Sequence, residues 1–129
     1  MQIKKPSSLK RQVSINYRVG ENSINTTGIT LLPHQVEGIK WMIRRELTQT
    51  THRGGLLSDD MGLGKTIQML TTILGNSGGT TLLVLPNSLM SQWLSMLTKT
   101  NLRVGMFQGK NRSLVMTRGF ENFDIVLTT

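Results

Sequence analysis

The sequence predicts an α/β protein built on a parallel β-sheet with helices on both faces. Short apolar runs alternate along the chain with stretches in which apolar residues recur at helical spacing. A glycine-rich turn joins one of these runs to the helix-like stretch that follows it. The 129 residues are enough for one domain, and the lack of cysteine excludes disulfides and thiolate metal sites.

Residues 1–29 are expected to form a basic, polar segment that is partly disordered. We expect disorder over residues 1–12, a strand over residues 13–19, where apolar and polar residues alternate, and a loop over residues 22–30. The first twenty residues contain no acid and five basic residues: Lys4, Lys5, Lys10, Arg11 and Arg18. Such a segment attracts polyanions such as nucleic acid, but a solvated basic tail explains the charge equally well.

A helix is predicted to begin around Pro33, because proline suits the first turn of a helix. Its apolar face is formed by Val36, Ile39, Met42, Ile43 and Leu47. Residues 48–55 then read as a surface connection. Trp41 in this helix and Trp93 further along are both expected to pack in the core.

The glycine-rich turn covers residues 58–66 and is predicted to bind phosphate. It lies between an expected strand at residues 54–58 and an expected helix at residues 66–74 that Gly75 ends. Gly62 and Gly64 let the backbone curl around an anion, Lys65 would reach the outer phosphates, and Thr66 would bind magnesium. The general pattern has glycine where Asp59 stands, and the alternative is an exposed turn with an incidental Gly-Lys-Thr.

The remainder of the chain continues the alternation. We expect a central parallel strand over residues 80–85, a helix over 89–99, a strand over 102–107, a short helix over 113–118 ended by Gly119, and a strand over 125–128. Asn87 or Ser88 would cap the second of these elements. Its predicted buried residues are Leu89, Trp93, Met96 and Leu97.

No apolar run approaches the roughly 20 residues that span a bilayer, and the N-terminus lacks the apolar core of a secretory signal. We therefore expect a soluble intracellular protein without a membrane partner.

Four motifs in order resemble the N-terminal part of the Snf2-family DNA-dependent ATPases, a branch of the superfamily 2 helicases. They are Leu-Pro-His-Gln-Val-Glu-Gly-Ile-Lys-Trp-Met (32–42), Asp-Asp-Met-Gly-Leu-Gly-Lys-Thr (59–66), Leu-Leu-Val-Leu-Pro-Asn-Ser-Leu-Met-Ser-Gln-Trp (82–93) and Phe-Asp-Ile-Val-Leu-Thr-Thr (123–129). In that family Asp59 is a match, and Asp60 replaces the usual glutamate. The details are most similar to the transcription-terminator, lodestar and viral global-transactivator type of member.

The resemblance implies that residues 30–129 are the first part of an ATP-binding, RecA-like P-loop lobe. It implies that Gln35 reads adenine, although a solvated polar residue in a first helical turn is the plain alternative. ATP and Mg²⁺ would be held by Asp59, Asp60, Met61, Gly62, Leu63, Gly64, Lys65 and Thr66, with Thr66 on the metal. Asp59 and Asp60 would position water or metal, or simply lie at the surface or cap.

The same resemblance implies a surface for double-stranded DNA. Asn87, Ser88, Thr128 and Thr129 correspond to family blocks that face the DNA backbone, where short polar side chains suit phosphate contacts. A plain capping role for Ser88 is at least as good an explanation. An enzyme of this kind would work in the nucleus or at a site of viral replication.

An ATPase of this type also needs an acidic motif, a second RecA-like lobe and an arginine across the cleft. Downstream of Lys65 the only acids are Glu121 and Asp124, and neither follows an apolar strand as that motif demands. We therefore expect a fragment that binds ATP without hydrolysing it, so enzymatic activity of the chain itself stays open.

Two rival functions remain. One is a non-catalytic nucleic-acid-binding or decoy polypeptide that works through the basic N-terminus. The other is a P-loop kinase or GTPase, which Gln35 and the Pro86-Asn87-Ser88 block disfavour.

Overall fold

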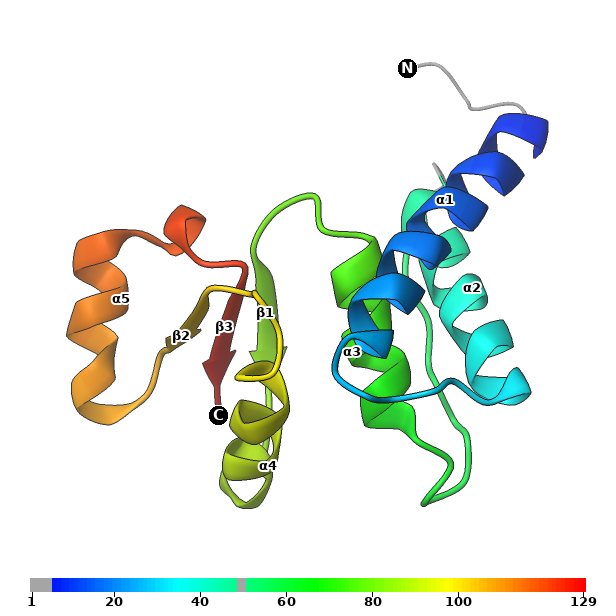
Figure 1. Cartoon of the computed structure of the whole chain (residues 1–129). Coiled ribbons are helices and arrows are strands. Elements are labelled where there is room, and N and C mark those ends of the chain that lie inside the picture. Colours follow the sequence, from blue (N-terminus) through cyan, green and yellow to red (C-terminus); the bar gives the residue numbers. More distant parts are fainter. Residues whose placement is uncertain (1–5, 49–50) are drawn as a thin grey trace. The chain divides into compact units, whose positions relative to one another are not determined.

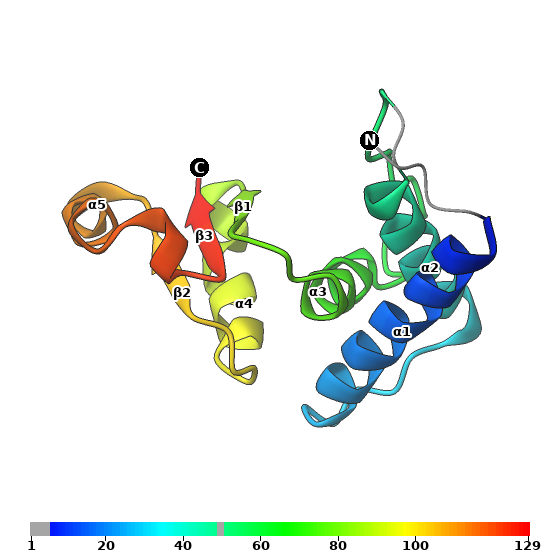
Figure 2. The ribbon, with the colours of Figure 1, turned by 90° about the horizontal axis from the view of Figure 1, so that it is seen from above.

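The chain, seen in a computed structural model that describes residues 6–48 and 51–129, forms two compact units (Figure 1). The first, Met1–Asn76, contains helices α1 (Pro6–Asn25), α2 (Pro33–Leu47) and α3 (Lys65–Gly75). Each of these helices packs against the other two, as the view from above also shows (Figure 2). The second unit, Ser77–Thr129, contains the β-sheet.

Helix α1 corrects the prediction for the N-terminal region. It replaces both the disorder expected over residues 6–12 and the strand expected over residues 13–19, while the disorder expected over residues 1–5 lies outside the described residues. The loop expected over residues 22–30 begins only after Asn25. The buried residues of α1 are Val13, Tyr17, Gly20 and Ile24, whose spacing is that of a helix face. Ile15 and Val19 made the pattern look alternating, but each is 49% exposed.

Two glycines allow α1 and α3 to approach each other closely. A Cβ atom on Gly20 would lie 2.5 Å from the backbone oxygen of Thr71, and one on Gly75 would lie 2.3 Å from the backbone oxygen of Asn16. Neither distance is tolerable for a real side chain. The absence of side chains at both positions therefore sets the packing of α1 on the helix that follows the glycine-rich turn.

The core of the first unit joins α1 to α2, whose predicted position is confirmed. Val13 and Tyr17 pack against Ile39 and Ile43, and partly buried residues surround them: Leu9, Leu31, Val36 and Leu47. Helix α1 thus forms one side of this core.

Tyr17 makes polar contacts at the edge of that core. Its hydroxyl donates a hydrogen bond to Glu21, and the ammonium of Lys40 lies 4.7 Å from the centre of its ring. Burial, helped by the hydrogen bond and the charge of Glu21, raises the pKa of Tyr17 to about 12.

The strand predicted over residues 54–58 is wrong. This segment has no regular secondary structure, and Leu56 is 82% exposed. An apolar run becomes a strand only where another strand accepts its hydrogen bonds, and none of the described strands pairs with it. Trp41, predicted to lie in the core, is 37% exposed. Its ring lies close against this segment, as shown by Gly55, where an added Cβ atom would be 2.5 Å from the ring.

The second unit holds a parallel sheet with strands β1 (Thr81–Val84), β2 (Val104–Met106) and β3 (Ile125–Thr128). The strand order is β1-β3-β2, with Val84 beside Thr128 and Met106 beside Leu127. All three strands lie within predicted segments, but the central strand is β3 and not β1 as predicted. The apolar run of β3 explains its place, because Ile125, Val126 and Leu127 are each at most 1% exposed.

Helix α4 (Asn87–Leu97) follows β1 and confirms the predicted helix, although it begins and ends about two residues earlier than expected. It buries Trp93 and Leu97 as expected, together with Met90; Leu89, predicted to be buried, is 40% exposed. The predicted cap is also wrong, since Pro86 is the N-cap and makes no side-chain hydrogen bond.

The connection from β2 to β3 runs through the short helices η1 (Gly109–Asn111), α5 (Arg112–Arg118) and η2 (Phe120–Asn122). Gly119 ends α5 with a φ of 86°, as predicted. None of the helices in the described residues is long and apolar enough to cross a membrane.

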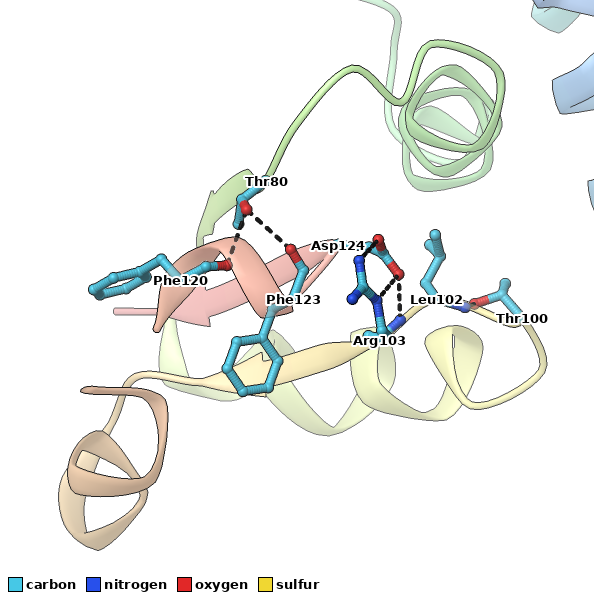
Figure 3. A network of polar contacts seen from close by, with 7 residues as sticks. All are labelled: Thr80, Thr100, Leu102, Arg103, Phe120, Phe123 and Asp124. Carbon is cyan, nitrogen blue, oxygen red and sulfur yellow. Dashed lines mark hydrogen bonds and ion pairs between the residues drawn. The ribbon is translucent and has the colours of Figure 1, made fainter. Parts of the chain in front are cut away.

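An ion pair fastens the start of β3 to the residue before β2 (Figure 3). Asp124 accepts hydrogen bonds from the guanidinium of Arg103 at 2.8 and 3.2 Å and from its backbone amide at 2.7 Å. These bonds lower the pKa of Asp124 below its ordinary value. Asp124 therefore has a structural partner at the amino end of β3.

Candidate functional site

The glycine-rich turn contains two glycines in a left-handed backbone conformation. Gly62 and Gly64 both have φ of 83°, in the left-handed region that favours glycine. Gly64 is also the N-cap of α3, so the turn leads directly into the helix. Glycine at these two positions therefore has the conformational role that the sequence predicted.

The amino end of α3 opens onto this turn. Its first helical hydrogen bond runs from the amide of Gln68 to the carbonyl of Gly64, at 3.1 Å. The amides of Lys65, Thr66 and Ile67 precede that bond and have no partner within the helix. Amides in this arrangement, together with the helix dipole, favour a negative group in front of them.

Lys65 and Asp59 face each other across the turn. The ammonium of Lys65 donates a hydrogen bond to the backbone oxygen of Asp59. The carboxylate of Asp59 in turn accepts a hydrogen bond from Nε2 of Gln68, at 3.0 Å. The backbone oxygen of Asp59 thus holds the ammonium of Lys65 at the start of the loop.

Helix α2 contacts the other end of the turn through Gln35. The Nε2 group of Gln35 donates to the backbone oxygen of Leu63 at 3.2 Å, and its Oε1 accepts from the amide of Leu32 at 2.9 Å. Gln35 is only 5% exposed, so the alternative of a solvated polar residue is wrong. Because an amide group has two donors and two acceptor lone pairs, these two hydrogen bonds use only one of each.

The tip of the turn is exposed. Met61 is 94% exposed, Leu63 is 41% exposed, and the side chain of Asp60 also faces solvent. Asp60 therefore lies at the surface, whereas Asp59 is half-buried and held by Gln68.

The polar residues predicted to face DNA come together in the second unit. Asn87 follows β1 and Thr128 ends β3, and these parallel strands lie side by side. Thr128 donates from its hydroxyl to the backbone oxygen of Phe107, at 2.9 Å, at the end of β2. The carboxyl ends of parallel strands meet at one edge of a sheet, so Ser88 and Thr129 belong to the same edge.

Three contacts were not predicted from the sequence. Gln68 holds Asp59, His34 lies 2.9 Å from the backbone oxygen of Leu63, and Gln108 donates from Nε2 to Oδ1 of Asn87. A polar Gln68 beside the apolar face of α3 was a usable signal. The other two depend on contacts between distant segments, which no local pattern reveals.

Comparison with known proteins gives the family. The SNF2-related domain matches residues 34–129. An uncharacterized ATP-dependent helicase of Schizosaccharomyces pombe is 38% identical over 110 residues, which are 78% of this chain and 10% of the relative. The probable global transactivator of Orgyia pseudotsugata multicapsid polyhedrosis virus is 45% identical over 80 residues, 60% of this chain and 16% of the relative.

A solved structure agrees with these relatives. The SWI2/SNF2 ATPase core of Sulfolobus solfataricus in complex with double-stranded DNA superposes with a TM-score of 0.66 at 31% identity, over 78% of this chain and 21% of that chain. The present chain thus spans a small part of the relatives it matches. The motif order, the phosphate-type loop and the parallel sheet agree with the match. The chain belongs to the SNF2-related domain family, whose ATPase core has a RecA-like fold.

Proposed function

We propose that this chain is the ATP-binding part of a Snf2-type, DNA-dependent ATPase that translocates along duplex DNA. The observation that carries the proposal is the loop of the first unit, where Gly62 and Gly64 curl the backbone and Lys65 is the first residue of α3. Residues 30–129 would supply the first part of the N-terminal RecA-like lobe. A second lobe, an acidic motif and an arginine from other sequence would complete the ATPase site.

In this proposal the triphosphate lies against the amides that open α3, and Lys65 donates to the outer phosphates. Thr66 would contribute its hydroxyl to the accompanying magnesium, an ion that prefers oxygen ligands and phosphates. When bound, the ion neutralises charge on the phosphates. Gln35 would use its remaining donor and acceptor on the edge of adenine.

Asn87, Ser88, Thr128 and Thr129 would contact the backbone of double-stranded DNA from the carboxyl edge of the sheet. Contacts of this kind fix the register of a protein on DNA without reading sequence. Work on double-stranded DNA would place the complete enzyme in the nucleus or at a site of viral replication.

The test compares the chain with its Lys65→Ala variant in magnesium-dependent ATP binding and in DNA-stimulated hydrolysis. We expect ATP binding by the chain, a loss of at least about tenfold in the variant, and no turnover by either. Lys10→Ala is the matched control, because it removes a lysine that α1 exposes to solvent. Equal ATP affinity in the chain and in Lys65→Ala would refute the proposed phosphate site, and Lys65-dependent turnover would refute binding without hydrolysis.

A further inference from the structure

Gln68 is a buried amide that the proposed ATP chemistry leaves without a role. It lies in the first turn of α3 and is 0% exposed. Its Nε2 donates to Oδ2 of Asp59 at 3.0 Å, while its Oε1 has no hydrogen-bond partner among the described residues. Buried polar groups normally have partners, so a half-satisfied amide at this position calls for a reason.

The unpartnered oxygen of Gln68 lies against the backbone of α2. A Cβ atom on Gly38 would lie 1.9 Å from Oε1 of Gln68, a distance that no real side chain tolerates. The lack of a side chain at Gly38 therefore makes the space in which the amide lies. The orientation of Gln68 is fixed between α2 on one side and Asp59 on the other.

Asp59 receives two hydrogen bonds from the same face of α3. Lys65 and Gln68 are one turn apart; the first donates to the backbone oxygen of Asp59 and the second to its carboxylate. An ammonium group has three donors. With the Asp59 carbonyl fixed, one donor of Lys65 is directed to the protein and two stay free for phosphate oxygens.

We infer that Gln68 is a positioning residue of the phosphate-binding loop, which orients the Lys65 ammonium through Asp59. The inference rests on the proposed ATP-binding function and adds to it a residue that does not touch the nucleotide. It also gives α2 a contact with each end of the loop. Gln35 meets the loop at Leu63, and Gly38 meets it through Gln68 at Asp59.

The decisive variant is Gln68→Glu, which keeps the shape of the side chain and replaces its donor with a carboxylate. Two carboxylates at hydrogen-bond distance repel each other and neither can donate to the other, so the contact between position 68 and Asp59 is lost. At about pH 8 we expect ATP and ADP to bind roughly tenfold more weakly, with adenosine binding unchanged.

Three further variants complete the test. Asp59→Asn combined with Gln68→Glu restores one donor and one acceptor and should recover affinity at about pH 8. Gly38→Ala should reproduce the phosphate-specific loss, because the added Cβ displaces the Gln68 amide. Gln12→Glu is the matched control, since Gln12 donates to Asn16 on α1 and not to the loop.

Hydrogen–deuterium exchange of residues 59–64, measured without nucleotide on the same variants, tests the loop itself. Faster exchange in Gln68→Glu at about pH 8 that the added Asp59→Asn substitution slows again supports the inference. Unchanged hydrogen–deuterium exchange, or a loss of ATP affinity that the Asp59→Asn substitution does not repair, overturns it. A failure of the proposed function is distinguishable, because then the unmodified chain shows no Lys65-dependent ATP binding.

Discussion

Gln35 and Leu63 join helix α2 to the phosphate-type loop through a hydrogen bond of 3.2 Å from Nε2 to the backbone oxygen. The two residues are 28 positions apart in the sequence. A residue expected to read the base of the nucleotide is therefore also in contact with the loop expected to hold its phosphates. Changes to Gln35 should affect both.

Replacing Gln35 with alanine should reduce the preference for ATP over GTP by roughly tenfold, because the variant loses the donor and acceptor available to the adenine edge. Overall affinity should fall as well, since Leu63 loses a partner. Competition binding with the two nucleotides measures the ratio. The control is Gln12→Ala, a glutamine of α1 remote from the loop in sequence, and an unaltered ratio in Gln35→Ala would contradict the assignment.

Lys110 lies in η1, two residues after Gln108, and should contact DNA phosphate at the carboxyl edge of the sheet. Lys110→Ala is expected to weaken binding of duplex DNA severalfold and to reduce the slope of log affinity against log salt by about one. Lys99→Ala removes another exposed lysine, beyond the carboxyl end of α4, and should change neither quantity. If Arg11 and Arg18 of α1 carry the salt dependence instead, the basic N-terminal binder is the better description.

Gly20→Ala should destabilise the first unit, because the new Cβ would lie 2.5 Å from the backbone oxygen of Thr71. Overpacking of this kind costs about 1–3 kcal/mol, and the gain in helix propensity offsets about 1 kcal/mol of it. Urea unfolding followed by circular dichroism measures the net loss. Gly78→Ala, at a position open to solvent, should stay within about 0.5 kcal/mol of the original chain; equal stability of the two variants would disprove the close crossing.

The single tyrosine of the chain, Tyr17, should ionise near pH 12 in the folded protein and near pH 10 after unfolding in urea. A folded-state pKa above the unfolded value stabilises the fold below pH 10, and that contribution is lost as the pH rises toward 12. Near-ultraviolet absorbance of the phenolate follows the titration directly. Glu21→Gln should lower the folded pKa by removing a nearby charge, and ionisation of the folded chain near pH 10 would contradict the buried environment.

Much of the fold was predictable because its signals are local. The apolar face of α2, the glycines of the loop and the unbroken apolar run of β3 each determine one element without help from distant residues. The strand expected over residues 13–19 failed because Val13 and Tyr17 fit a strand pattern and a helix pattern alike. Only packing against α2 and α3 decides between the two.

The candidate site was predictable to the same extent. Glycine spacing and the Gly-Lys-Thr sequence were enough to place the loop, whose backbone needs left-handed residues at Gly62 and Gly64. The polar Gln68 beside an apolar helix face was a signal, but the hydrogen bonds that Gln68 and Gln35 make to the loop were not predictable. Both depend on the approach of α2, which Gly38 and tertiary packing allow. Strand order was missed for the same reason, because pairing is a property of segments far apart in the chain.

The contribution of α1 to the core matters for the choice of domain boundaries when shorter versions of this protein are expressed. The family match begins at residue 34, so a boundary drawn from sequence similarity would delete residues 6–25 as a dispensable leader. That cut would leave Ile39 and Ile43, which are fully buried when α1 is present, facing water. A shortened product should therefore be insoluble or poorly folded, and its failure to bind ATP would say nothing about the loop.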